Sequence, residues 1–170
     1  MNMRLHLSFA TLLALASTTT HAQQSPDRGG ALAVPANRIV GLWDTEPLIR
    51  PCGSTEAPTP THTTVLFNTG GTWVESPRFP PGGIPSPNGQ VQRSGGLGTW
   101  SYSPLTAQYT AHMRFDWYLD GAYDGYMTVD RRILLSSNGL RAGGPVRATR
   151  YAADGSFVAQ LCGSASAARL

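Results

Sequence analysis

Lysine is absent from this chain of 170 residues, so all 13 of its basic residues are arginines. Against 10 acidic residues they give a formal charge of only +3. The arginines are interleaved with Asp and Glu, whereas a protein that binds nucleic acid gathers its basic residues on one face or along one element. The charge pattern therefore gives no support to a nucleic-acid partner, and none is expected.

Long apolar runs are also missing. A helix that spans a bilayer needs roughly 20 consecutive apolar residues, whereas the longest mainly apolar stretch runs only from Leu5 to Ala16. Arg4 precedes this stretch and a T-H-A sequence follows it, as in a secretory signal peptide cleaved after Ala22. We therefore expect residues 1–22 to be a signal peptide and the product to be soluble and exported, in the periplasm or outside the cell, without stable membrane insertion.

Histidine and cysteine are scarce, with 4 and 2 residues. After residue 22 only His62 and His112 remain, far apart in sequence, so no metal site is expected. No C-x-x-C or G-x-S-x-G motif occurs, and no cofactor is expected. Cys52 and Cys162 are an even pair in a chain expected to be exported, which favours a disulfide between them. In the chain-entropy model, closing so large a loop stabilises the fold by about 4–5 kcal/mol.

Helical periodicity is absent after residue 37, where many of the 19 glycines and 13 prolines interrupt every candidate segment. Residues 23–37 are rich in Gly, Pro and polar side chains and are expected to form a flexible lead-in. Residues 38–170 are expected to be one domain, long enough to bury a core. Residues 77–96 hold so many prolines and glycines that we expect an irregular loop there, at the mouth of the fold.

Strand signals recur through residues 38–170. They predict eight strands, at 38–49, 61–69, 72–76, 97–103, 107–119, 122–136, 140–152 and 156–170. Asp120-Gly121, Asn138-Gly139 and Asp154-Gly155 are strong signals for hairpin turns between the last four. An open sheet of eight long strands would expose two edges. We therefore predict an all-β fold, a single eight-stranded antiparallel up-and-down barrel, with a β-sandwich as the alternative. The barrel would place the first strand beside the last, and hence Cys52 near Cys162.

The segment from Tyr109 to Leu119 alternates between apolar and polar side chains. Successive side chains on a strand point to opposite faces, so one parity is expected to line the barrel. An eight-stranded barrel either fills its interior with side chains or holds one small ligand. The candidate ligand-binding residues are the apolar side chains expected to point inward: Phe67, Trp73, Trp100, Tyr102, Tyr109, Met113, Phe115 and Trp117.

The opposite parity of this segment carries His112, Arg114 and Asp116. If these side chains faced an apolar interior, their pKa values would shift and they could perform acid–base catalysis. If they faced outward, they would form a solvated surface with an Arg114–Asp116 pair worth at most about 1 kcal/mol, and the sequence favours this arrangement. The D-R-R sequence at 130–132 is likewise interpreted as an exposed strand segment rather than an anion site.

The start of the domain, V-G-L-W-D-T-E at 40–46, resembles the G-x-W motif that opens lipocalins and related calycin barrels. Cys52, the R-S-G-G-L-G-T-W sequence at 93–100 and Cys162 extend the resemblance to small exported bacterial proteins of calycin-like outline, a largely uncharacterised family. The resemblance covers about residues 39–170. It implies a barrel whose closed end is built by Gly41 and Trp43, with Arg169 of the last strand against the tryptophan.

These features lead to three functional hypotheses. The main one is a secreted, lipocalin-like barrel that binds a small apolar or amphipathic ligand and is not an enzyme. The second is a cofactor-free isomerase or cyclase of the allene oxide cyclase type, with His112, Arg114 and Asp116 as its catalytic residues. The third is a filled barrel that acts as an envelope or surface interaction module. The sequence leaves the ligand and the oligomeric state open.

Overall fold

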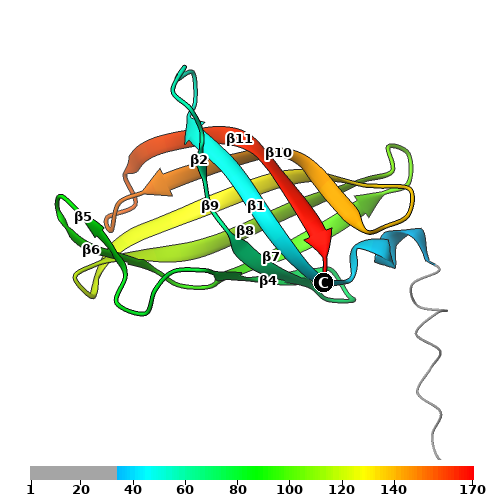
Figure 1. The fold of residues 1–170 in the computed structure, drawn as a ribbon, viewed down its shortest axis with the longest axis horizontal. Helices are drawn as coiled ribbons and strands as arrows, with labels where there is room; N and C mark the ends of the chain where they lie inside the picture. The colour runs from blue at the N-terminus through cyan, green and yellow to red at the C-terminus, as the bar shows by residue number, and fades with distance from the viewer. Residues whose placement is uncertain (1–33) are drawn as a thin grey trace, which may run out of the picture.

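Eight antiparallel strands close into a barrel in the computed structural model, which describes residues 34–170 (Figure 1). The predicted signal peptide, residues 1–22, and the predicted lead-in up to residue 33 lie outside the described residues. The barrel strands in chain order are β1 (Gly41–Pro51), β3 (Thr63–Phe67), β4 (Thr72–Pro77), β7 (Gly96–Ser103), β8 (Gln108–Leu119), β9 (Ala122–Leu135), β10 (Arg141–Tyr151) and β11 (Phe157–Arg169). Each pairs with the next and β11 pairs with β1, so the predicted all-β barrel is confirmed and the β-sandwich is not the fold.

A covalent link between the two cysteines closes the seam between the first strand, β1, and the last, β11. Strands β1 and β11 pair in a register that sets Arg50 opposite Cys162. Cys52 directly follows β1, and its amide N–H donates to the Gln160 carbonyl over 2.9 Å. The predicted disulfide between Cys52 and Cys162 is confirmed, and it joins residues 110 apart in sequence.

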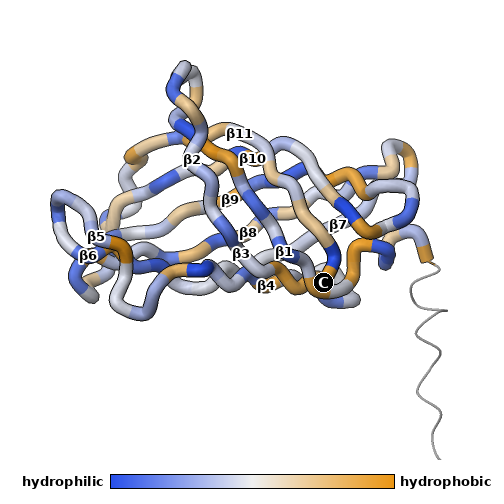
Figure 2. Tube along the Cα trace, in the orientation of Figure 1, coloured by the Kyte–Doolittle hydropathy of each residue, from blue (hydrophilic) through white to orange (hydrophobic). Residues whose placement is uncertain are grey.

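Side chains alternate between interior and exterior along the barrel strands, and Figure 2 shows hydrophobic and hydrophilic stretches following one another along the chain. On β8 the buried positions are Tyr109, Ala111, Met113 and Phe115, and the exposed positions between them are Thr110, His112 and Arg114. Each large apolar side chain that is fully buried stabilises the folded state by about 1.5–3 kcal/mol relative to an exposed one. The turn from β8 to β9 has positive φ at both Asp120 (49°) and Gly121 (80°), as a two-residue hairpin requires.

A short 3-10 helix, η1 (Pro35–Ile39), covers one end of the barrel and buries Ile39 completely. The Tyr109 hydroxyl donates to the Pro35 carbonyl over 2.7 Å, and Trp43 Nε1 donates to the Ile39 carbonyl over 2.8 Å. Residues 35–37, which the sequence predicts to belong to the flexible lead-in, instead lie within this helix. Across residues 34–170, no helix has both the length and the apolar character needed to cross a bilayer.

Arg169 lies against Trp43 at this closed end, with its Cζ 4.3 Å from the ring centroid. Its guanidinium donates to the carbonyls of Val40 and Gly139 over 2.8 and 3.0 Å. Gly41 has a φ of +133°, and a Cβ there would stand only 2.6 Å from Arg169 Nη1. The glycine thus leaves the room in which the arginine lies, so that Arg169 can cover the Trp43 ring and donate to the Val40 and Gly139 carbonyls.

The opposite end of the barrel carries a small hairpin of β5 (Ile84–Ser86) and β6 (Gly89–Arg93) (Figure 1). Strand β6 pairs with the end of β8 that extends beyond β7, and β2 (Thr59–Pro60) pairs with β1 in a similar way. Residues 77–96 do not form the irregular loop expected from the sequence, because they contain this hairpin. The Asn88-Gly89 turn supplies the backbone geometry, with a φ of +131° at Gly89, and the free edge of β8 supplies hydrogen-bond partners.

Candidate functional site

The barrel interior is hollow toward the end that carries the β5–β6 hairpin. An outer chamber of about 310 Å³ adjoins an inner chamber of about 60 Å³. The two share the lining residues Ile49, Thr61, Thr63, Arg93, Phe115 and Met127. The outer chamber reaches the surface, because the exposed residues Arg50, Glu56 and Thr59 also line it. Its volume matches the lower end of small-molecule sites, about 300 Å³, so the interior has room for a small ligand.

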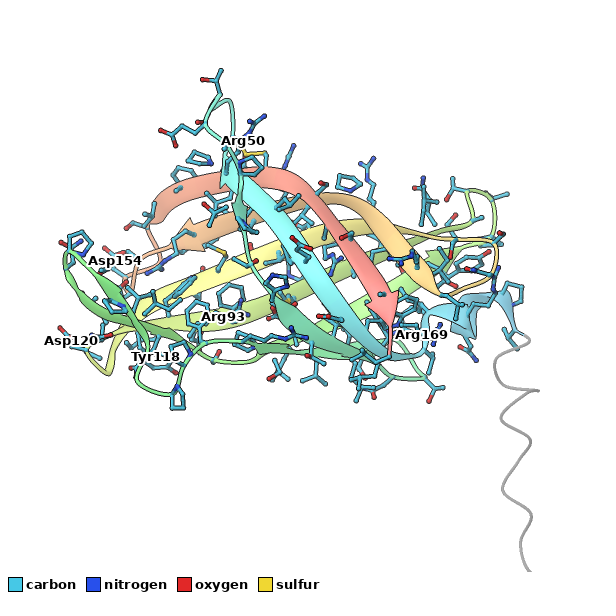
Figure 3. The ribbon with its side chains drawn as sticks, viewed as in Figure 1. Arg50, Arg93, Tyr118, Asp120, Asp154 and Arg169 are labelled. Carbon is cyan, nitrogen blue, oxygen red and sulfur yellow. A yellow bond between two sulfur atoms is a disulfide. The ribbon has the colours of Figure 1, made fainter. Side chains whose placement is uncertain are left out.

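Glu75 and Arg93 form a buried ion pair within this hollow half. Alternation on β4 turns Glu75 inward. Arg93 is the last residue of β6, which pairs with β8 at the barrel mouth. Figure 3 shows Arg93 toward the hairpin end of the barrel, far from Arg169. The Glu75 and Arg93 side chains are only 3% and 9% exposed. Arg93 Cζ also lies 3.5 Å from the ring centroid of Phe115. The pair therefore holds one cationic side chain where the two chambers meet.

Burial disfavours the charged form of both partners. It raises the pKa of Glu75, and the charge and hydrogen bond of Arg93 and a hydrogen bond from Thr63 only partly oppose the rise. Burial also lowers the pKa of Arg93, against the opposing effect of Glu75. Each charge is thus tolerated in the interior because the other neutralises it.

Arg131 is a second cation inside the barrel. It shares the inward parity of β9 with Val129 and Ile133, and it is 6% exposed. Its Nε is buried and donates to no acceptor within the described part of the chain. Burial lowers the pKa of Arg131 to about 10, and the negative charge of Glu75 only partly opposes this shift. Arg131 is therefore still a cation at neutral pH.

The inner chamber carries one more positive than negative charge. Its charged lining residues are Glu75, Arg93 and Arg131. Because Glu75 already accepts from Arg93, the guanidinium of Arg131 is left without an ion-pair partner of its own. A buried charge without compensation costs several kcal/mol, about 3–5 when a pair is broken. The inner chamber is therefore an electropositive pocket, and keeping its excess charge buried lowers the stability of the folded protein.

Trp117 Nε1 is the other buried side-chain donor without a partner among the described residues. Trp117 lines the outer chamber, where its ring lies 6.0 Å from that of Phe79 between centroids. Nearly all buried donors in folded proteins have an acceptor, so each unsatisfied one requires an explanation. The two residues that carry the unsatisfied donors of residues 34–170 both line the hollow half of the barrel, Arg131 the inner chamber and Trp117 the outer one.

The eight predicted ligand-binding residues divide between the two halves of the barrel. Trp73, Met113 and Phe115 line the inner chamber, and Phe115 and Trp117 line the outer one. The remaining four, Phe67, Trp100, Tyr102 and Tyr109, line neither chamber. They pack together toward η1, where the Trp100 and Tyr109 rings meet edge to face with centroids 5.9 Å apart. One half of the barrel is filled and the other is hollow.

His112, Arg114 and Asp116 lie on the outer face of β8, with side chains 58%, 54% and 36% exposed. His112 Nδ1 is 2.8 Å from Asp130 Oδ1, and Arg114 Nη2 is 3.2 Å from Asp116 Oδ1. The catalytic alternative requires these three side chains to face the interior. The arrangement is instead the solvated, paired surface that the sequence favoured.

Glu75, Arg93 and Arg131 were not among the predicted site residues. Parity could have identified two of them, because Glu75 stands two positions from Trp73 and Arg131 two positions from Val129. The interpretation of D-R-R at 130–132 as an exposed segment was wrong for its central residue, since the pleat turns the middle side chain inward. Arg93 begins the R-S-G-G-L-G-T-W sequence, but nothing in that sequence indicated an inward position, which depends on β6 pairing with β8.

The polar groups of the residues that line the two chambers include guanidinium, hydroxyl and indole N–H donors, which suit ligands with hydrogen-bond acceptors, besides the Glu75 carboxylate that already accepts from Arg93. Within residues 34–170, no three His, Cys, Asp or Glu side chains gather as a metal ion would require. No family model, no curated protein and no solved structure matches the chain. The geometry of the hollow half is therefore the basis on which a function can be assigned.

Proposed function

We propose that this protein is an exported, lipocalin-like barrel that binds a small apolar or amphipathic molecule in its two interior chambers and does not catalyse a reaction. The observation that carries the proposal is that the two residues with unsatisfied buried donors, Arg131 (Nε) and Trp117 (Nε1), line the two chambers. A ligand with a hydrogen-bond acceptor would satisfy donors that the protein itself leaves unpaired.

The chamber walls support this proposal. Apolar side chains dominate the inner chamber, among them Val65, Met113, Met127, Val129, Val146 and Ala148. The outer chamber also has largely apolar walls, to which Phe79, Phe115, Trp117 and Leu161 belong. Small-molecule sites combine predominantly apolar walls with a few polar groups that orient the ligand. Methionine side chains add adaptable surface that fits ligands of different shape.

The direct test is a titration of the purified protein with Nile red, a neutral apolar dye. Saturable dye fluorescence is expected, together with quenching of tryptophan emission, because Trp73 and Trp117 line the chambers. Dye fluorescence that rises without saturation, with unchanged tryptophan emission, would contradict the proposal and favour the filled-barrel alternative.

A matched pair of variants locates the binding. Thr61 lines both chambers, so Thr61→Trp places a large ring inside them and is expected to abolish saturable binding. Thr110 is exposed on β8, and Thr110→Trp makes the same change on the outer face. Equal dye binding by the two variants would place the dye outside the barrel and overturn the assignment.

A further inference from the structure

The buried guanidinium of Arg131 narrows the class of ligand. We infer that the molecule bound in the barrel is an amphipathic monoanion, whose carboxylate is held by Arg131 in the inner chamber and whose apolar tail extends through the outer chamber. This inference rests on the proposed function and makes it more specific. It is carried by a buried guanidinium nitrogen without an acceptor, Arg131 Nε, on a residue that lines the inner chamber and is 6% exposed.

The first step of the argument is charge balance. Glu75 and Arg93 neutralise each other, and Arg131 adds one further positive charge to the same chamber. In a medium of low dielectric, a single charge is stabilised most by one opposite charge at hydrogen-bond distance. A ligand with one negative charge would balance the interior, whereas a neutral ligand would leave the excess and a cation would increase it.

The second step is the chemistry of the donor. A guanidinium presents its N–H groups in a planar fork that matches the two oxygens of a carboxylate. The Nε of Arg131 belongs to this fork and has no acceptor within residues 34–170. A carboxylate can therefore accept a hydrogen bond from Arg131 Nε without displacing an acceptor that belongs to the described residues.

The third step is the space on either side of Arg131. The inner chamber of about 60 Å³ is too small for a whole ligand but accommodates a small polar group. The adjoining outer chamber of about 310 Å³ has largely apolar walls and leads to the surface. The orientation that fits both volumes has the head group in the inner chamber and the tail in the outer chamber. Arg93, which lines both chambers, lies where the head and tail would meet.

The test compares three ligands with the same chain and different head groups: decanoate, decanol and decyltrimethylammonium, each by displacement of Nile red below its micellar concentration. A charge-assisted hydrogen bond is worth about 1.5–3 kcal/mol, so we expect decanoate to bind at least about tenfold more tightly than decanol. The ammonium compound is expected to bind most weakly. Decanoate affinity no higher than that of decanol would overturn the inference.

Two variants assign the effect to one residue. Arg131→Met removes the buried charge, and Arg132→Gln removes the neighbouring charge on the exposed face of the same strand. Arg131→Met is expected to abolish the preference for decanoate over decanol, because the charge that distinguishes the two head groups is gone. Arg132→Gln is expected to keep the preference. If both variants kept it, Arg131 would not be the carboxylate partner and the inference would fail.

The two proposals fail in different ways. If decanol and decanoate bind the wild-type protein equally, the barrel is a binder of apolar molecules and only the inference is wrong. If neither ligand nor Nile red binds saturably, the proposed function itself is wrong and the inference falls with it. If Arg131→Met does not fold, Arg131→Gln replaces it, since its amide retains polarity without charge.

Discussion

Glu75 and Arg93 form an ion pair inside the barrel although their strands, β4 and β6, are not neighbours in the sheet. The pair satisfies the one carboxylate of the inner chamber and leaves Arg131 without a comparable partner. A fold selected for stability alone has no use for a buried cation of this kind, whereas a binding site does. The three charged residues therefore connect the architecture of the mouth to the proposed ligand.

The first prediction concerns the stability cost of Arg131. Arg131→Met is expected to raise the free energy of unfolding of the ligand-free protein by about 1–2 kcal/mol, because a buried charge is replaced by an apolar side chain of similar length. Urea denaturation at neutral pH measures the change, with Arg132→Gln as a control expected to stay within about 0.5 kcal/mol of wild type. Destabilisation by Arg131→Met would show that the guanidinium serves the fold rather than a ligand.

The second prediction concerns pH. Burial raises the folded-state pKa of Glu75 above its ordinary value of 4.5. The contribution of Glu75 to stability is then fully present below pH 4.5 and is lost as the pH rises through the folded-state pKa. Glu75→Gln/Arg93→Gln removes this titration without leaving Arg93 as an unpaired charge. The free energy of unfolding of wild type, relative to this double variant, is expected to fall as the pH rises above 4.5; a difference that rises with pH there would contradict the raised pKa.

The third prediction concerns the seam. Replacing both Cys52 and Cys162 by serine opens a loop of 110 residues. In the chain-entropy model the free energy of unfolding falls by about 4–5 kcal/mol, because the unfolded chain regains the freedom that the disulfide removed. Denaturant unfolding of the variant measures the loss. A loss below about 1 kcal/mol would show that pairing of β1 with β11 suffices to close the barrel.

The fourth prediction concerns the outer face of β8. His112→Gln and Asp116→Asn are expected to change the free energy of unfolding by no more than about 1 kcal/mol, because both side chains belong to exposed pairs. Neither substitution is expected to alter Nile red affinity. A loss of dye binding in either variant would place the site on this outer face and not in the chambers.

Much of the fold could be predicted from the sequence because its signals are local. Strands β8 and β9 are joined by Asp120-Gly121, which adopts the positive φ values that such a dipeptide favours. The β5–β6 hairpin was missed even though Asn88-Gly89 is the same kind of signal. The prolines around it outweighed that signal, and its stability comes from an edge of β8 that only the folded barrel exposes.

The candidate site was less predictable because it depends on distant parts of the chain. The parity of β9 places Arg131 among Val129 and Ile133, but the tendency of arginine to lie at the surface argued against an inward position. The Glu75–Arg93 contact joins two strands that do not pair. The division into a filled half and a hollow half depends on side-chain volumes that alternation alone does not specify.

The pKa of a bound carboxyl group tests the central claim most directly. Decanoate labelled at its carboxyl carbon can be followed by NMR during an acid titration, both free and bound to the wild-type protein. A guanidinium at hydrogen-bond distance favours the ionised form, so the account predicts a bound carboxyl pKa below that of free decanoate. An apolar chamber without such a partner would raise it instead. A bound pKa at or above the free value would contradict the claim that Arg131 holds an anionic ligand inside the barrel.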